Sequence, residues 1–145
     1  MKTVAEILRT KPQAAVYSVE PTTTVLEAIK LMAEKGIGAL VVLERGRLAG
    51  IVSERDYARK IVLLERSASD IAISEIMTAD VITVSLRDTA QECMQLMTDR
   101  HLRHLPVVAE GELIGLLSIG DLVKDTIAEQ ASLIQQLEQY IRGEV

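Results

Sequence analysis

The chain has 145 residues, of which 48% are hydrophobic and 26% are charged, which suffices for one compact unit with a hydrophobic core. Its net charge of −5 argues against a general nucleic-acid-binding surface, and no apolar run approaches the ~20 residues that a membrane span needs. The single cysteine, Cys93, excludes an internal disulfide. Because the N-terminus also lacks a signal-peptide pattern, we expect a cytoplasmic protein.

The sequence contains an internal repeat. A shift of 65 positions aligns Tyr17–Lys60 with Ile82–Asp125 without a gap. The identical pairs include Gly46/Gly111, Gly50/Gly115, Ser53/Ser118 and Asp56/Asp121. Upstream, Val4–Leu8 matches Ile73–Met77 at a slightly longer offset, and the extra residues fall within the loop Arg9–Ala15.

Each copy of the repeat predicts the same order of elements. A short apolar segment (16–19 or 81–84) precedes a helix that Thr22 or Thr23 caps in the first copy and Asp88 in the second. Two strands joined by a glycine turn follow, and then a second helix that starts at Ser53 or Ser118. The expected strands are Ala39–Leu43, Leu48–Val52, Leu105–Ala109 and Leu113–Leu117.

The order β-α-β-β-α, present twice, predicts an α/β (α+β) fold of two small units that pack together with pseudo-two-fold symmetry. Asp125–Ile141 predicts an additional C-terminal helix with one apolar stripe. This stripe could fold back on the core or pair with a second chain, and we expect a homodimer. The expected boundaries are 1–72 for the first repeat, 73–124 for the second and 125–145 for the C-terminal helix.

The repeated motifs resemble the CBS domain (the cystathionine-β-synthase repeat) over nearly the whole chain. The segments that carry the resemblance are Gly50–Asp56, Gly115–Asp121, Arg103–Val108, Ile76–Thr78 and Val81–Val84. The resemblance implies a stand-alone CBS pair that senses an adenine nucleotide (AMP, ADP, ATP or NAD) between its repeats. It further implies a regulatory module for signal transduction that acts on a separate partner protein, is not an enzyme and needs no catalytic cofactor.

The central candidates for the ligand site are Ser53-x-x-Asp56 and Ser118-x-x-Asp121. An ionised aspartate can accept two hydrogen bonds from a ribose diol, and a serine at a helix N-terminus can offer its hydroxyl to a phosphate. The same spacing also describes a capping box, which does no more than start a helix. A single copy would favour the cap, whereas the duplication and the family pattern favour the ligand site, and the two roles are compatible.

Arg103 and His104 belong to the one dense basic cluster of the sequence, beside Arg100 and His101. An arginine fork suits phosphate geometry and a histidine can donate a hydrogen bond, and the resemblance implies that phosphates are reached from this position. The alternative is a solvated loop, which we favour for Arg100 and His101.

The two sites are not expected to be equivalent. In the first repeat, Gly38 and Ala39 occupy the positions of the basic pair and would leave backbone open to an adenine edge. Arg55, a further phosphate candidate, is matched by Gly120 in the second repeat.

A planar base would be held by aliphatic side chains and backbone, because the chain has no Trp or Phe and only three Tyr. The candidates for the adenine pocket are Val16, Tyr17, Ile37, Gly38, Ala39, Ile51, Val81, Ile82, Leu102, Pro106 and Leu116, with Lys11 and Thr78 as weaker ligand candidates. For most of these residues a structural core position is the simpler interpretation.

No metal site or catalytic set is indicated by the motifs. The two histidines lie three residues apart with no cysteine or acid at ligand spacing, and no nucleophile–base pair or P-loop is present. Two alternatives to a nucleotide sensor are considered. One is a ligand-independent scaffold that dimerises and docks a partner, and the other is a weak nucleotide hydrolase.

Overall fold

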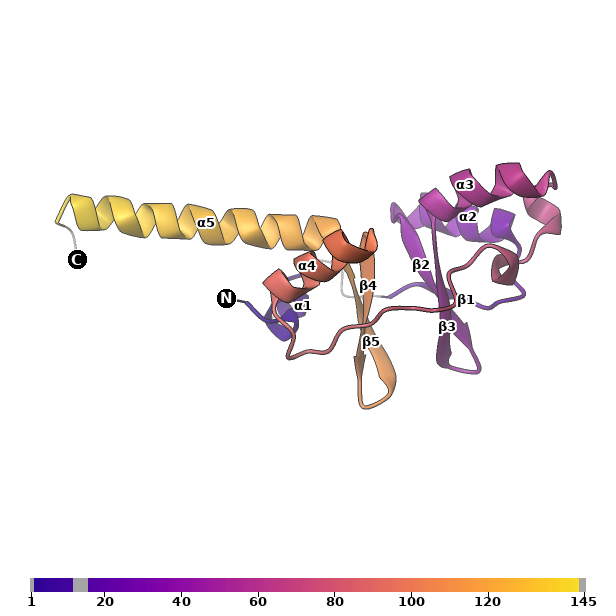
Figure 1. Ribbon diagram of the computed structural model, residues 1–145, viewed down its shortest axis with the longest axis horizontal. Coiled ribbons are helices and arrows are strands. Elements are labelled where there is room, and N and C mark those ends of the chain that lie inside the picture. The colour runs from indigo at the N-terminus through magenta and orange to yellow at the C-terminus, as the bar shows by residue number, and fades with distance from the viewer. Residues whose placement is uncertain (1, 12–15, 144–145) are drawn as a thin grey trace. The chain divides into compact units, whose positions relative to one another are not determined.

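The computed structural model of the chain describes residues 2–11 and 16–143 (Figure 1). These residues form two compact units. Unit 1 comprises residues 2–11, 85–105 and 117–143, and unit 2 comprises residues 16–84 and 106–116. Of the loop Arg9–Ala15, positions 12–15 lie outside the described residues. In the part of the chain that the structure describes, no helix has the length and apolar character of a membrane span.

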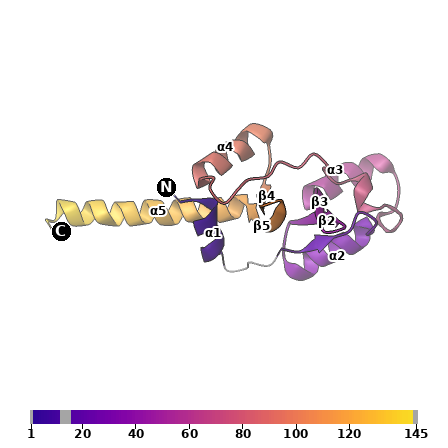
Figure 2. The same ribbon diagram turned by 90° about the horizontal axis from the view of Figure 1, so that it is seen from below.

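Unit 2 is built on a three-stranded sheet in the order β1-β2-β3. Strand β1 (Ser18–Val19) runs parallel to β2 (Ala39–Glu44), which pairs antiparallel with β3 (Arg47–Ser53). Helices α2 (Val25–Lys35) and α3 (Glu54–Leu64) pack beside these strands (Figure 2). The β2–β3 hairpin therefore runs directly into the N-terminus of α3.

The core of unit 2 comes from the apolar face of α2, from alternate residues of the strands and from two short 3₁₀ turns. The turns are η1 (Ala68–Asp70) and η2 (Ile73–Glu75). The residues of this core are Val25, Ala28, Met32, Leu40, Val42, Val52, Ile71, Ile73 and Ile76. On α2 they recur at the three- and four-residue intervals of a helix that buries one face.

Unit 1 contains α1 (Val4–Thr10), α4 (Ala90–Arg100) and α5 (Ile119–Ile141). The N-terminal segment pairs with the start of α4, since Val4 N–H donates to Asp88 O (2.8 Å) and Ala90 N–H donates to Lys2 O (2.9 Å). The hairpin of β4 (His104–Ala109) and β5 (Glu112–Ser118) has its open end in unit 1 and its remainder in unit 2.

The α/β class and the C-terminal helix are confirmed, and the order helix, strand, strand, helix recurs in both copies. Each of the four expected strands is present, and each is longer than predicted by one residue at one end or at both. The apolar segment 81–84 is not a strand, because only an isolated bridge joins Val84 to Val107. Helix α1 had not been predicted, and its counterpart in the second repeat is only the 3₁₀ turn η2.

The predicted caps of α2 and α4 are wrong by one or two residues. Thr24 caps α2, because its Oγ1 accepts the Glu27 N–H at 3.2 Å, while Thr23 closes the preceding turn. Thr89 caps α4 in the same way. The Asp88 carboxylate instead accepts the Ser85 N–H at 2.8 Å and closes the turn before the helix. The same side-chain types occur in turns and in helix caps, so residue type alone does not identify which residue caps the helix.

Candidate functional site

The N-terminus of α5 in unit 1 carries the Ser118-x-x-Asp121 motif as a complete capping box. Ser118 Oγ accepts the Asp121 N–H at 3.1 Å, and Asp121 Oδ2 accepts the Ser118 N–H at 2.8 Å. Lys11 Nζ lies 2.9 Å from the same Oδ2. Within the described residues, Oδ1 of Asp121 makes no hydrogen bond. Oδ2 is therefore held by two groups, the Ser118 N–H and the Lys11 ammonium, while Oδ1 keeps its capacity to accept hydrogen bonds.

The Asp121 carboxylate is ionised at neutral pH. Burial alone would raise its pKa, but the hydrogen bond from the Ser118 N–H and the contact with the Lys11 ammonium outweigh burial and lower it. An ionised carboxylate only accepts hydrogen bonds, which is the capacity that a ribose diol requires.

His104, the first residue of β4, belongs to the same unit and lies within the electrostatic reach of Lys11 and Asp121. Burial is the main cause that lowers its pKa, and the positive charges of Lys11 and Arg103 act in the same direction, against Asp121. Its imidazole is consequently neutral at pH 7. Arg103 is exposed and has its carbonyl tied to the start of α5, where it accepts the Ile119 N–H at 2.8 Å.

The Ser53-x-x-Asp56 motif forms the equivalent capping box at the start of α3 in unit 2. Asp56 Oδ2 accepts the Ser53 N–H (2.9 Å) and the Ser53 hydroxyl (3.1 Å), and Ser53 Oγ accepts the Asp56 N–H (3.2 Å). Lys60 Nζ lies 3.3 Å from Asp56 Oδ1 and donates to Ile76 O at 2.7 Å. The Ser53 hydroxyl proton is thus engaged by its own cap, and a phosphate would have to draw it away.

The two helix N-termini have few backbone N–H groups left for an anion. The first N–H of each helix donates to a carbonyl that precedes a strand, from Glu54 to Gly38 and from Ile119 to Arg103. The third N–H of each helix donates to the capping serine. Among the contacts of the described residues, the second N–H of each helix, at Arg55 or Gly120, is the one left to attract a phosphate.

The other predicted site residues divide between the units as follows. In unit 2, most residues of the expected adenine pocket are half-buried, while Ala39 and Pro106 are buried and Arg55 is exposed on α3. The half-buried residues of this unit are Val16, Tyr17, Ile37, Gly38, Ile51, Thr78, Val81, Ile82 and Leu116. Leu102, also half-buried, belongs to unit 1.

Backbone pairing holds several of the unit 2 residues together. Ile51 and Thr78 exchange two backbone hydrogen bonds, of 3.0 and 2.9 Å. Tyr17 O accepts the Val41 N–H at 3.4 Å, and its ring lies 5.3 Å from Lys35 Nζ. Gly50 allows the Ile51–Thr78 pairing, because a Cβ at this position would lie 2.9 Å from Thr78 O.

Two basic residues at the capping boxes were missed or ranked low from sequence. Lys60 had not been considered, although an acid followed four residues later by a lysine predicts a pair on one helix face. Lys11 had been a weak candidate, and it contacts Asp121 directly. No local pattern signalled that contact, because the two residues are far apart in the sequence.

The fold and the two matching helix N-termini define a repeat protein with one Ser-x-x-Asp element in each unit. The chain belongs to the CBS-domain family, whose model matches residues 4–63 and 73–128. It is 38% identical to the mitochondrial CBS domain-containing protein CBSX3 of Arabidopsis thaliana, over 97% of this chain and 72% of that protein.

Solved structures show the same fold. A proposed signal-transduction protein with CBS domains from Burkholderia ambifaria is 56% identical, with a TM-score of 0.86 over 89% of this chain and 96% of that one. The CBS domain pair of protein MJ0100, solved in complex with 5′-methylthioadenosine and S-adenosyl-L-methionine, has a TM-score of 0.77 over 89% of this chain and 98% of that one. At 23% identity, the latter likeness concerns the fold alone.

Proposed function

We propose that this chain is a regulatory module that binds an adenosine-containing ligand, of the AMP, ADP, ATP or NAD class, and performs no chemistry on it. The observation that carries the proposal is the surroundings of Asp121. Its ionised carboxylate is held on Oδ2, while Lys11 and the neutral His104 belong to the same unit. An acceptor for a sugar diol and donors for a phosphate are therefore brought together from distant segments of the chain.

The roles assigned to the ligand groups follow from this chemistry. Asp121 and Asp56 accept from the ribose hydroxyls of the two sites. Phosphate donors are more numerous at Asp121, where they are Ser118, Arg103, His104 and Lys11, than at Asp56, where they are Ser53, Arg55 and Lys60. The half-buried apolar residues named above supply the adenine pocket. We accordingly expect the Asp121 site to prefer the ligand with more phosphate charge.

The regulatory part of the proposal rests on the family. The similar Burkholderia protein is itself a proposed signal-transduction protein, and a CBS pair of the same fold is solved with adenosine ligands. A ligand that binds one arrangement of the chain more tightly than another shifts the population toward that arrangement. The regulated protein would respond to this shift because it binds the two arrangements differently.

Isothermal titration calorimetry with AMP, ADP, ATP, NAD and S-adenosylmethionine tests the proposal. Asp121→Ala should weaken one site by about 10-fold or more, because a hydrogen bond to a charged group contributes about 1.5–3 kcal/mol. Thr89→Ala is the matched control, since it removes a helix cap without touching either motif. The proposal fails if no ligand binds at millimolar concentration, or if Thr89→Ala weakens binding as much as Asp121→Ala does. Chromatography after incubation with ATP or NAD should show unchanged ligand, and a product would contradict the non-catalytic role.

A ligand-independent docking module is the second candidate. The observation that favours it is that both Ser-x-x-Asp elements are complete capping boxes, so a structural role already accounts for the residue types. This candidate predicts that Ser118→Ala costs about 1 kcal/mol of stability and leaves the titrations and the binding of the partner protein unaffected.

A further inference from the structure

The second half of α5 is exposed on every side. The first two turns pack into unit 1 through Leu122 and Asp125, which are buried, and every residue from Ile127 to Ile141 is exposed. Figures 1 and 2 both show this end of α5 extending clear of α1 and α4, the other helices of unit 1. A helix segment of roughly 15 residues is marginally stable in water by itself, so packing against a partner would stabilise this part of α5.

A regular heptad pattern runs along the exposed part of α5. Apolar residues and one glutamine alternate at intervals of four and three, which are the a and d positions of a coiled coil. They are Val123, Ile127, Gln130, Ile134, Leu137 and Ile141. The exposed fractions are 61% for Ile127, 56% for Ile134, 53% for Leu137 and 83% for Ile141.

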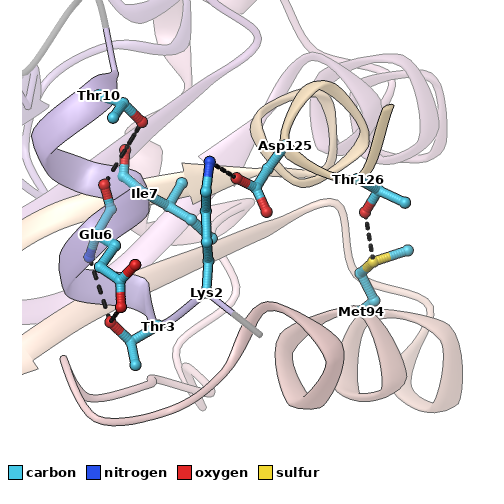
Figure 3. Close-up of polar contacts among 8 residues, drawn as sticks. All are labelled: Lys2, Thr3, Glu6, Ile7, Thr10, Met94, Asp125 and Thr126. Atoms are coloured by element: carbon cyan, nitrogen blue, oxygen red, sulfur yellow. Dashed lines mark hydrogen bonds and ion pairs between the residues drawn. The ribbon is translucent and has the colours of Figure 1, made fainter. Parts of the chain in front are cut away.

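This stripe faces away from the side by which α5 is attached to unit 1. In the heptad frame, Leu122 and Asp125 occupy positions c and f, opposite the a/d seam. Asp125 Oδ1 lies 2.8 Å from Lys2 Nζ beside α1, and Thr126 Oγ1 donates to Met94 Sδ on α4 at 3.5 Å (Figure 3). Thr126 occupies position g, so the attachment reaches the edge of the seam at this turn, and the seam residues from Ile127 to Ile141 remain exposed.

We propose that the seam binds a second copy of this chain, as a parallel and in-register two-stranded coiled coil. The a positions are Ile127, Ile134 and Ile141, and the d positions are Val123, Gln130 and Leu137. Isoleucine at a with leucine at d, the combination that Ile134 and Leu137 provide, favours two parallel strands. Gln130, the one polar residue of the seam, has an amide that both donates and accepts. In a parallel pair it meets its own copy and both amides are satisfied, whereas in a shifted or antiparallel pair it faces an apolar side chain.

Charge and area also fit a second copy. Between Ile127 and Ile141 the only charged residues are Glu129 and Glu138, which lie outside the seam. The seam itself is therefore uncharged and does not favour a strongly charged partner. Leu133 and Tyr140, exposed by 55% and 74%, flank the seam and widen it. Two such faces would together bury on the order of 1,000 Å², which is about the minimum for a specific interface. The pairing does not depend on the proposed ligand binding.

Cysteine cross-linking of the full chain tests the geometry. Ile127→Cys and Ile141→Cys should each form an intermolecular disulfide when oxidised alone, because a residues meet their own copies in a parallel pair. Ser132→Cys and Gln139→Cys, at position f, are the controls and should stay uncrosslinked. The native Cys93 does not interfere, since it is fully buried and burial raises its pKa to about 11. Cross-links that form only in a mixture of the 127 and 141 variants would show an antiparallel pair and overturn the proposal, as would equal cross-linking at the controls.

Sedimentation velocity gives an independent readout. The wild-type chain should sediment at twice its 15.9 kDa monomer mass at tens of micromolar. The double variant Ile134→Glu/Leu137→Glu should be a monomer, while Ser132→Glu/Gln139→Glu keeps the wild-type mass. A monomeric wild-type chain, or a double variant that keeps the dimer mass, contradicts pairing through this seam. Circular dichroism of each variant shows whether unit 1 is still folded.

Discussion

The imidazole of His104 and the groups around it make the stability of unit 1 depend on pH. The pKa of His104 in the folded chain lies below the ordinary value of 6.5, chiefly because burial disfavours the charged form. The unfolded chain therefore binds more protons than the folded chain once the pH drops below about 6.5. The stability contributed by neutral His104 is complete above that pH and is lost as the pH falls through the folded-state pKa.

We predict that the free energy of unfolding decreases from pH 7 to pH 5 in the wild-type chain and decreases less in His104→Gln. His101→Asn is the control, because His101 is exposed and Asn tolerates its left-handed backbone. Asp121 does not add to the effect, since its pKa is lowered from 3.8 and it titrates below this window. Urea unfolding at several pH values measures the difference. Identical profiles for the wild-type chain and His104→Gln would contradict the assignment.

The carboxylate of Asp125 is buried in unit 1, with a partner for one of its two oxygens (Figure 3). Oδ1 pairs with Lys2 Nζ, while Oδ2 has no hydrogen-bond partner in the described part of the chain. A buried ion pair is weak evidence for stability in itself, but removing one partner leaves an uncompensated charge. Lys2 thus acts mainly as the group that neutralises Asp125.

A double-mutant cycle tests that role. Lys2→Met should lower the urea midpoint more than the double variant Lys2→Met/Asp125→Leu does, because the double variant leaves no unpaired charge behind. We expect the double variant to recover at least half of the loss. Additive effects of the two single substitutions would show that Lys2 and Asp125 are not coupled.

The helix caps show how far sequence patterns specify the elements. The two caps with a Ser-x-x-Asp spacing were placed correctly, because the acid three residues later is a distinctive signal. The start of α2 lies in a run of three threonines, Thr22–Thr24, where each residue type suits both a turn and a cap. The structure separates them by hydrogen bonds that depend on the preceding turn. Likewise, segment 81–84 has the composition of a strand and yet forms only one bridge.

Substitution of these threonines should separate the two roles. Thr24→Ala is expected to cost about 1 kcal/mol of stability, because the Glu27 N–H loses its acceptor. Thr22→Ala changes an exposed residue of the same type and should cost less than about 0.5 kcal/mol. Chemical denaturation of the two variants gives the comparison. A larger loss for Thr22→Ala than for Thr24→Ala would show that Thr22 is the residue that caps α2.

The repeat does not predict which segments of the chain make up each of the two units. The repeat shows which segments resemble one another, whereas packing decides which segments share a core. Helix α1, from the beginning of the chain, lies in unit 1 with α4 and α5. Val4 is fully buried there, and Val4 and Ala5 donate backbone hydrogen bonds to Asp88 and Leu86. The same long-range packing brings Lys11 to Asp121, which explains why local motifs ranked Lys11 low.

Removal of residues 1–11 should therefore unfold a distant part of the chain. Ala90 N–H would lose its acceptor, Lys2 O, and the buried face that Val4 and Ile7 cover would be exposed to water. We expect amide exchange in α4 (Ala90–Arg100) to accelerate at least tenfold, and α2 (Val25–Lys35), whose core contacts lie within unit 2, to change much less. Removal of residues 142–145 is the control and should leave both helices protected. Because unit 1 is assembled from three separate segments, a peptide of residues 1–11 added in trans should slow amide exchange in α4 again. If the deletion leaves exchange in α4 unchanged, the stability of α4 does not depend on α1.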